Sequence, residues 1–164
     1  MLSRSLFLRR LAAAGLLLAG FAAAGAAEDL LKVESSVQPL RLARGEEGKV
    51  LLKITVKRGI ALNAQASLTI EFEPMEELVF PKNFFTAADL SVPRVEIGGK
   101  EYLDLKKFVE IPLTVNPKAR RGVHVLRGRI KYIATSLSEN WCYKSSVKFA
   151  ATFSTRLTPV RTGT

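Results

Sequence analysis

The chain has 164 residues, a formal net charge of +10 and a single cysteine. One cysteine excludes a disulfide within the chain, and one histidine argues against a zinc site built from clustered His and Cys ligands. The excess of lysine and arginine favours anionic partners.

The first 27 residues have the layout of a secretory signal peptide. Three arginines form a basic start, an apolar run over 11–24 follows, and small residues offer cleavage after Ala26 or Ala27. The run is short for a membrane span, and an uncleaved anchor is the alternative. We therefore expect an exported chain, periplasmic or otherwise secreted, with one domain, a charge of +7 and no further membrane span.

Apolar and polar residues then alternate with a period of two, which is typical of half-buried strands with one wet face. The clearest segments are 49–57, 67–74, 108–117, 128–135 and 146–154. Turn residues at 44–48, 73–74, 97–100 and 116–118 separate them. The pattern predicts an all-β fold, an immunoglobulin-like two-sheet β-sandwich of about seven to nine strands. We place this domain at 28–156 and a flexible tail at 157–164.

Two segments depart from this pattern. The segment 85–90 is the best candidate for a short helical turn. Pro112 interrupts a strand pattern, and proline cannot donate to a strand ladder, so we expect an edge strand or a bulge there.

Two sets of polar residues invite a chemical interpretation that the sequence does not favour. His124 is expected to be a surface strand residue, with a two-ligand site shared with Cys142 as the alternative. The acidic group Glu71, Glu73, Glu76 and Glu77 is expected to lie on a solvated face and turn, so we predict no acid–base pair, metal or cofactor there.

A basic run over 118–131, KARRGVHVLRGRIK, holds six cationic residues. It lacks the interleaved aromatic residues of a nucleic-acid surface, so no nucleic-acid partner is expected. Anionic lipid headgroups, envelope polymers or an acidic protein surface are the expected weak contacts of this face. An ordinary polar face opposite the core is the alternative.

Cys142 lies between Trp141 and Tyr143 in the stretch ENWCYKSS. Lys144 shares its face of an extended strand and would favour the reactive thiolate. A thiol of this kind forms mixed disulfides with partners. Burial as a small hydrophobe beside Trp141 is the other interpretation, and the residues alone favour it.

The order of motifs resembles the N-terminal periplasmic domain of the thiol:disulfide interchange protein DsbD. The resemblance spans 45–154 and includes the segments RGIALNA, SLTIEFEP, LVFPK, FVEIPLTV and GRIKYIAT…ENWCYKSSVKFAATF. It implies an immunoglobulin-like sandwich that receives electrons from a membrane partner and passes them to periplasmic thiol proteins.

The closing motif carries the site that this resemblance implies. Cys142 and Tyr143 match the second family cysteine and the aromatic residue after it, and Tyr132 matches the tyrosine before the first cysteine. The first cysteine is expected at Thr135 or Ser136, and neither is a cysteine. Asn63 is retained, whereas alanine stands at 61 where the family often has histidine. The predicted site is therefore Cys142 with Tyr132, Trp141, Tyr143, Lys144 and Asn63 around it.

One cysteine can form a mixed disulfide but cannot resolve it within the chain. The first functional hypothesis is therefore a binding module for another envelope protein, without full dithiol reductase activity. The alternative is a thiol-exchange component whose resolving thiol comes from a second copy of the chain or from a partner such as a thioredoxin-like or membrane electron-transfer protein.

Overall fold

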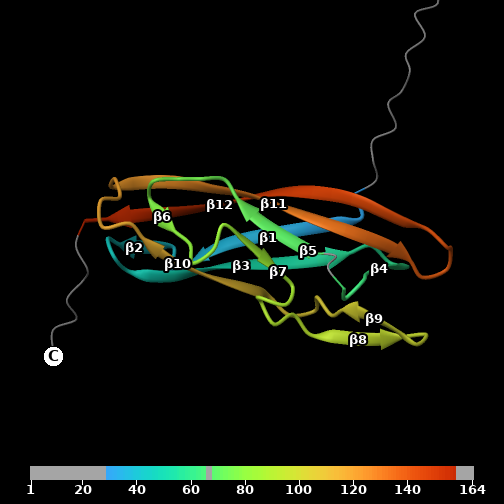
Figure 1. The fold of residues 1–164 in the computed structure, drawn as a ribbon. Helices are drawn as coiled ribbons and strands as arrows, with labels where there is room; N and C mark the ends of the chain where they lie inside the picture. Colours follow the sequence, from blue (N-terminus) through green and yellow to red (C-terminus); the bar gives the residue numbers. More distant parts are fainter. Residues whose placement is uncertain (1–28, 66–67, 158–164) are drawn as a thin grey trace, which may run out of the picture.

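The computed structural model describes residues 29–65 and 68–157, and every regular element in these ranges is a strand (Figure 1). The predicted signal peptide and residues 158–164 of the predicted tail lie outside the described residues. The strands are β1 (Leu31–Gln38), β2 (Arg41–Ala43), β3 (Glu47–Val56), β4 (Ile60–Leu62), β5 (Leu68–Phe72), β6 (Leu78–Val79), β7 (Phe84–Thr86), β8 (Arg94–Ile97), β9 (Lys100–Leu103), β10 (Val109–Val115), β11 (Gly122–Ser136) and β12 (Cys142–Arg156).

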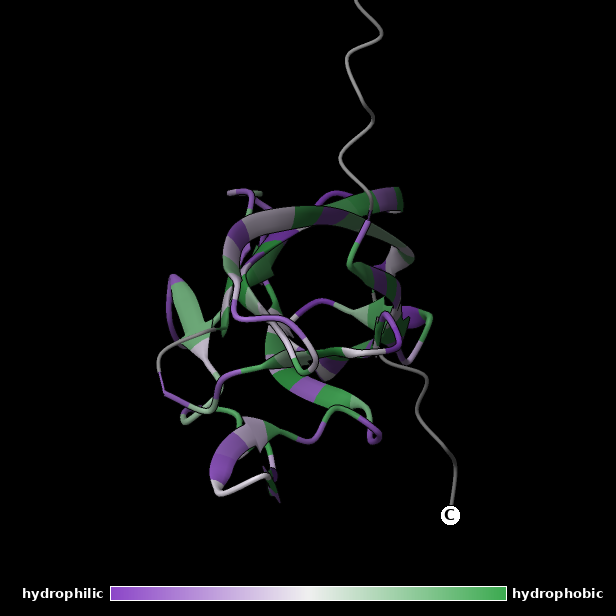
Figure 2. Cartoon of the chain, turned by 90° about the vertical axis from the view of Figure 1, so that its right-hand side faces the viewer, coloured by the Kyte–Doolittle hydropathy of each residue, from purple (hydrophilic) through white to green (hydrophobic). Residues whose placement is uncertain are grey.

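Two sheets pack face to face. The first has the order β1-β3-β10-β6, and the second has the order β2-β12-β11-β5-β7, with β4 also pairing β11. Figure 2 looks along the strands and shows the two sheets curving around the interior. A small third sheet, β8–β9, lies beside β4 (Figure 1). The predicted all-β, immunoglobulin-like sandwich is confirmed.

The period-two alternation determines which face of each long strand forms the core. In β3, Val50 and Leu52 are buried while Lys53 is exposed. In β11 and β12 the same alternation buries Ile130 and Phe153 on the inner face. Burying one such side chain contributes about 1.5–3 kcal/mol, so these repeats supply the main stabilisation of the sandwich.

Gly128 allows an aromatic cluster to pack between the sheets. A Cβ atom at this position would lie 2.4 Å from Cζ of Phe149 and 2.8 Å from the carbonyl oxygen of Glu71. Phe149 in turn packs edge-on against Phe72, which stacks on Phe80 with ring centroids 4.2 Å apart. A side chain at 128 would therefore displace both an aromatic ring and the neighbouring strand.

The structure has more strands than the predicted seven to nine because several have only two to four residues. Such strands are too short to show a periodic pattern. The segment 85–90 begins in β7 and continues in hydrogen-bonded turns, including Leu90 N–H to the Thr86 carbonyl at 3.2 Å, without forming a helix. Pro112 lies on β10 outside the stretch that β6 pairs, as expected for a residue that cannot donate to a ladder.

The prediction that all four acidic residues of 71–77 are solvated is wrong for Glu77, which is only 5% exposed. The chain folds back over it, because Asn116 N–H donates to the Glu77 carbonyl at 2.8 Å. Arg120 Nε donates to Oε1 of Glu77 at 3.1 Å, and His124 Nδ1 lies 3.8 Å from the same oxygen. His124 is accordingly half-buried, with Nε2 2.9 Å from Thr155 Oγ1.

Burial of the Glu77 carboxylate raises its pKa. The hydrogen bond from Arg120 and the nearby His124 lower this pKa, and the lowering effects outweigh that of burial. The net pKa of Glu77 lies below its ordinary value. This carboxylate is therefore charged at neutral pH and ties the turn before β6 to the start of β11.

Candidate thiol site

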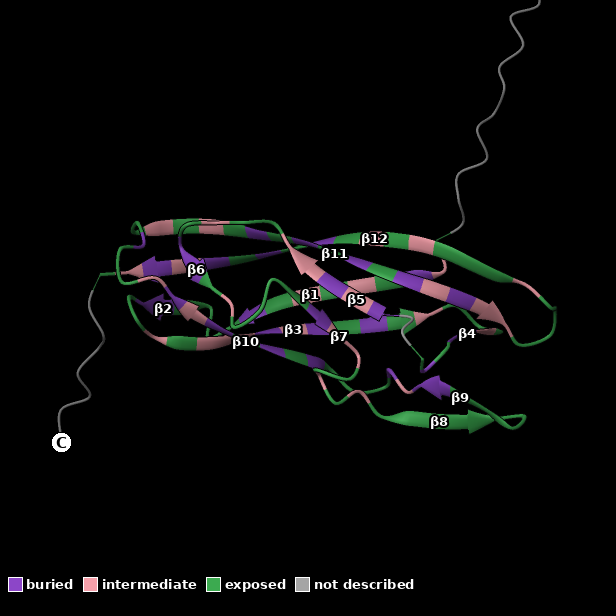
Figure 3. Cartoon of the chain, in the orientation of Figure 1, coloured by how far each residue is buried: buried purple, intermediate pink, exposed green. Residues whose placement is uncertain are grey.

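Cys142 is the first residue of β12 and is exposed, so the interpretation that it is a buried core residue is wrong. Its Cα partner across the hairpin is Thr135, and Sγ lies 3.5 Å from Thr135 Oγ1. Strands β11 and β12 each have 15 residues and extend as a hairpin past the end of the sandwich (Figure 3). The first sheet, β1-β3-β10-β6, does not cover this end of the hairpin, which explains the exposure of the thiol.

Hydrogen bonds hold the turn that presents the thiol. Ser136 N–H donates to the Trp141 carbonyl at 3.1 Å, and the Trp141 indole N–H donates to Glu139 Oε2 at 2.8 Å. Leu137 N–H donates to the Gly59 carbonyl at 2.9 Å, which anchors the turn to the residue before β4. Cys142 therefore projects from a defined turn.

A cleft of about 400 Å³ lies beside Cys142, between the tip of the β11–β12 hairpin and the β8–β9 hairpin. Residues from both hairpins line it, among them Ile97, Lys100, Tyr102, Leu137, Trp141 and Cys142. We call this the thiol cleft. Ile97 and Leu137 are 42% and 44% exposed, so its walls present apolar surface to solvent.

The β8–β9 hairpin depends on two glycines. Ile97 pairs with Lys100, and the two residues between them, Gly98 and Gly99, have φ values of 59° and 78°. Two positive φ values in a two-residue loop are typical of a type I′ turn, which favours glycine at both positions. The sequence indicates a turn at 97–100, but it does not indicate that the residues on either side of the turn line the thiol cleft. The apolar residues Val95 and Ile97 before the turn were the available signal.

A second cleft of about 420 Å³ adjoins the first. It shares Ile97, Tyr102 and Leu137 with the thiol cleft and is otherwise lined by β3, β4 and the β8–β9 region. Val95, on its wall, is also partly exposed. The two clefts thus adjoin at shared residues, and the thiol cleft, which also has polar lining residues such as Lys100 and Glu139, reaches Cys142.

The other predicted site residues occupy different surroundings. Trp141 lines the thiol cleft, while Tyr132 is buried on the core face of β11. Tyr143 is exposed and pairs with Ala134, so it points to the opposite face of the hairpin from Cys142. Asn63 forms a bridge to Tyr102, next to the cleft.

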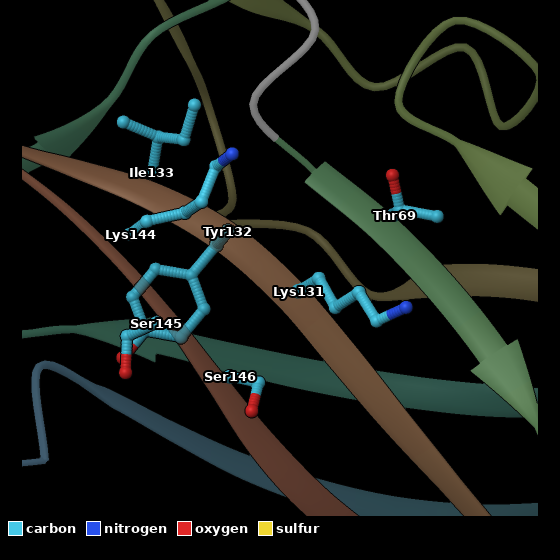
Figure 4. Close-up of a pocket in the computed structure, with 7 residues that line it drawn as sticks. All are labelled: Thr69, Lys131, Tyr132, Ile133, Lys144, Ser145 and Ser146. Carbon is cyan, nitrogen blue, oxygen red and sulfur yellow. The ribbon is translucent and has the colours of Figure 1, made fainter.

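Lys144 lies on the same face of β12 as Cys142 and lines a neighbouring groove of about 580 Å³. Figure 4 shows this groove, with Lys131, Ser146 and Thr69 also around it. Lys131 is held by Glu71, with Nζ 2.7 Å from Oε1. Lys144 therefore places a positive charge on the same face of β12, two residues from the thiol.

Neighbouring strands bring together the positions at which the family resemblance places its site. Thr135 pairs with Cys142 on one side and with Ala61 of β4 on the other. Side chains directly opposite one another in a sheet share a face. A cysteine at 135 would thus lie directly opposite Cys142, whereas the side chain of Ser136 points to the other face.

A two-ligand site of His124 and Cys142 is excluded by the register of the hairpin. His124 pairs with Phe153, while Cys142 pairs with Thr135 near the other end of β11. The two sites are about 36 Å apart along the strand at 3.3 Å per residue. Among the described residues, no group of three or more His, Cys, Asp or Glu side chains is placed to hold a metal ion.

Comparisons with known proteins do not assign a family. No protein-family model and no curated protein matches the chain. A crystal structure of a FixG-related protein from Vibrio parahaemolyticus is 14% identical, with a TM-score of 0.31, and covers 75% of this chain and 97% of that one. The structure of the CooA pilin subunit of enterotoxigenic Escherichia coli is 8% identical, with a TM-score of 0.25. That match covers 76% of this chain and 99% of the pilin chain. These scores are too low to transfer a function.

Within the described residues, no helix is long and apolar enough to cross a membrane.

Proposed function

We propose that the protein is an exported binding module that docks another envelope protein at the thiol cleft. The observation that carries this proposal is the exposed Cys142 at the edge of two adjoining clefts, where Ile97 and Leu137 present apolar surface to solvent. Exposed apolar surface of this kind marks protein interaction sites. A partner with a thioredoxin-like or membrane electron-transfer domain suits the chemistry, because its own disulfide or thiol would meet Cys142.

The sequence resemblance to the DsbD N-terminal domain supports the same choice of partner. Of the two positions expected for the first family cysteine, Thr135 and Ser136, Thr135 lies opposite Cys142. In this chain, however, a hydroxyl stands 3.5 Å from the sulfur where a second thiol would be needed. The protein therefore engages partners without completing a dithiol reaction alone.

Thiol exchange with an outside resolving thiol is the second candidate, favoured by the exposure of Cys142. The Cys142 thiolate attacks one sulfur of a partner disulfide, and the other partner sulfur leaves as a thiolate. A thiol from another molecule then attacks the Cys142 sulfur and releases the partner as a dithiol. Cys142 is left in a new mixed disulfide with that molecule.

The test compares two electrophiles on the same thiol: an oxidised thioredoxin-fold protein and a small aromatic disulfide. Ile97→Ala and Leu137→Ala remove apolar surface from the cleft wall without touching Cys142. We expect either change to slow mixed-disulfide formation with the protein about fivefold, equivalent to about 1 kcal/mol of docking contact. The reaction with the small disulfide should stay unchanged.

Val79→Ala is the matched control, because Val79 is an exposed apolar residue on β6, away from both clefts. Cys142→Ser should abolish both reactions. If the cleft variants and the control react alike with the protein disulfide, the cleft is not a docking site.

A further inference from the structure

A separate cleft of about 320 Å³ lies at the other end of the β11–β12 hairpin, away from the two clefts near Cys142. Three arginines line it: Arg41 of β2, Arg121 before β11 and Arg156 at the end of β12. Ser154 and Cys142 are twelve residues apart on β12, about 40 Å along the strand. This cleft, the arginine cleft, is therefore separate from the thiol cleft.

The strand pairing explains why the three arginines converge. Arg41 is paired in parallel with Ser154, and Thr155 is paired with Gly122. The chain thus brings β2 and the start of β11 to the two sides of β12. Residues from three separate stretches of sequence meet at one end of the six-stranded sheet.

The positive charge in this cleft is incompletely neutralised. Among the described residues, neither Arg41 nor Arg121 has a carboxylate within ion-pair distance. Arg156 Nη2 lies 3.4 Å from Glu46 Oε2, and this carboxylate also accepts a hydrogen bond from Ala43 N–H at 2.6 Å. Of the three arginines, only Arg156 has a carboxylate partner among the described residues.

An unpaired donor gives a second, independent observation. Nε of Arg156 is buried and is the one buried side-chain nitrogen or oxygen in the described structure without a hydrogen-bond partner. A buried N–H donor without an acceptor costs about 1–3 kcal/mol, so such groups usually have a partner. Arg156 also lines the cleft, so an anion bound there would lie beside the residue that carries this unpaired donor.

We propose that the arginine cleft binds a phosphate group. Guanidinium groups present several N–H donors in a planar fork that matches phosphate oxygens, and they keep their charge at any physiological pH. Free phosphate and the phosphate of a lipid headgroup share this chemistry. The outer face of β11 continues the positive charge away from the cleft through Arg127 and Arg129, both exposed.

The first measurement is a titration of the full chain with inorganic phosphate, followed by the NMR signals of arginine Nε–H groups. The Arg156 signal should shift and saturate. Arg41→Ala and Arg121→Ala should each weaken phosphate binding about tenfold, the loss expected for a charged hydrogen bond. Arg127→Ala is the matched control and should bind phosphate as the unmodified chain does.

Vesicles identify the source of the phosphate group. With phosphatidylglycerol vesicles, a lipid ligand predicts that Arg121→Ala lowers binding more than Arg127→Ala does. A soluble ligand predicts equal, purely charge-dependent losses in both variants while the phosphate titration still saturates. The proposal is overturned if the Arg156 signal does not respond to millimolar phosphate, or if Arg127→Ala weakens phosphate binding as much as Arg121→Ala. The variants leave Cys142 untouched, so failure here does not affect the docking proposal.

Discussion

Replacing Thr135 by cysteine should create a disulfide with Cys142. The two residues are direct partners in the β11–β12 hairpin, and their side-chain tips are already 3.5 Å apart. Directly opposed residues of antiparallel strands have Cα atoms about 4.5 or 5.5 Å apart. Both values lie within the range of about 4.4–6.8 Å that a disulfide spans. The hairpin therefore already has the geometry that a disulfide between positions 135 and 142 requires.

The bond would join positions 135 and 142 and close a loop of about eight residues. The chain-entropy relation gives about 2.5 kcal/mol of stabilisation for a loop of this size. With a urea m-value of about 1–3 kcal/mol/M, the unfolding midpoint should rise by about 0.8–2.5 M in the oxidised Thr135→Cys protein. The rise should vanish in reductant. Titration of free thiols should find none in the oxidised form.

Ser136→Cys is the control, since the neighbouring side chain points to the other face of β11. It should keep two free thiols and gain no stability. Two free thiols in oxidised Thr135→Cys, or equal cross-linking in Ser136→Cys, would refute the register and with it the proposed relation to the two-cysteine site.

Three further predictions follow from packing and charge. Cys142 should react with a small thiol reagent at a similar rate in the folded and the unfolded chain, and protection of more than about tenfold on folding would contradict its exposure. Gly128→Ala should lower the free energy of unfolding by about 1–3 kcal/mol in urea titrations, because the new methyl group would overlap Phe149, and a neutral effect would show that the ring moves freely. Glu77→Gln should cost about 1–3 kcal/mol at pH 7. Because the pKa of folded Glu77 lies below its ordinary 4.5, the charged carboxylate stabilises the fold above pH 4.5, and this stabilisation is lost as the pH falls further. The difference in unfolding free energy between Glu77→Gln and the unmodified chain should therefore be smaller at about pH 3 than at about pH 7 in urea titrations. An equal difference at both pH values would contradict the assigned charge.

The strands that could be predicted are the longer ones, in which every second side chain is buried. Val50, Leu52 and Ile54 in β3 show this clearly, and each is buried as expected. Strand β8 could not be found this way, because all four of its residues are exposed and no buried face imposes a period of two. Its position depends instead on the Gly98–Gly99 turn and on pairing with β9.

The exposure of Cys142 depends on the lengths of β11 and β12, which the alternation of apolar and polar residues did not predict. The sequence pattern predicted strands over 128–135 and 146–154, whereas β11 and β12 run from Gly122–Ser136 and Cys142–Arg156. The extra residues at the tip, Ser136 and 142–145, carry the hairpin past the sandwich and leave the thiol exposed. Glu77 was misjudged for a similar reason, since its burial depends on Asn116 and Arg120, about 40 residues away in sequence.

The measurement that tests the docking proposal most directly is a ratio of two rates for Cys142. The first is mixed-disulfide formation with an oxidised thioredoxin-fold protein, and the second is the reaction with glutathione disulfide. The folded chain should show a ratio at least about fivefold higher than a free peptide with the sequence ENWCYKSS, because only the folded chain presents the cleft. Equal ratios in the folded chain and the peptide would mean that the partner recognises nothing beyond an accessible thiol, and would contradict the proposal.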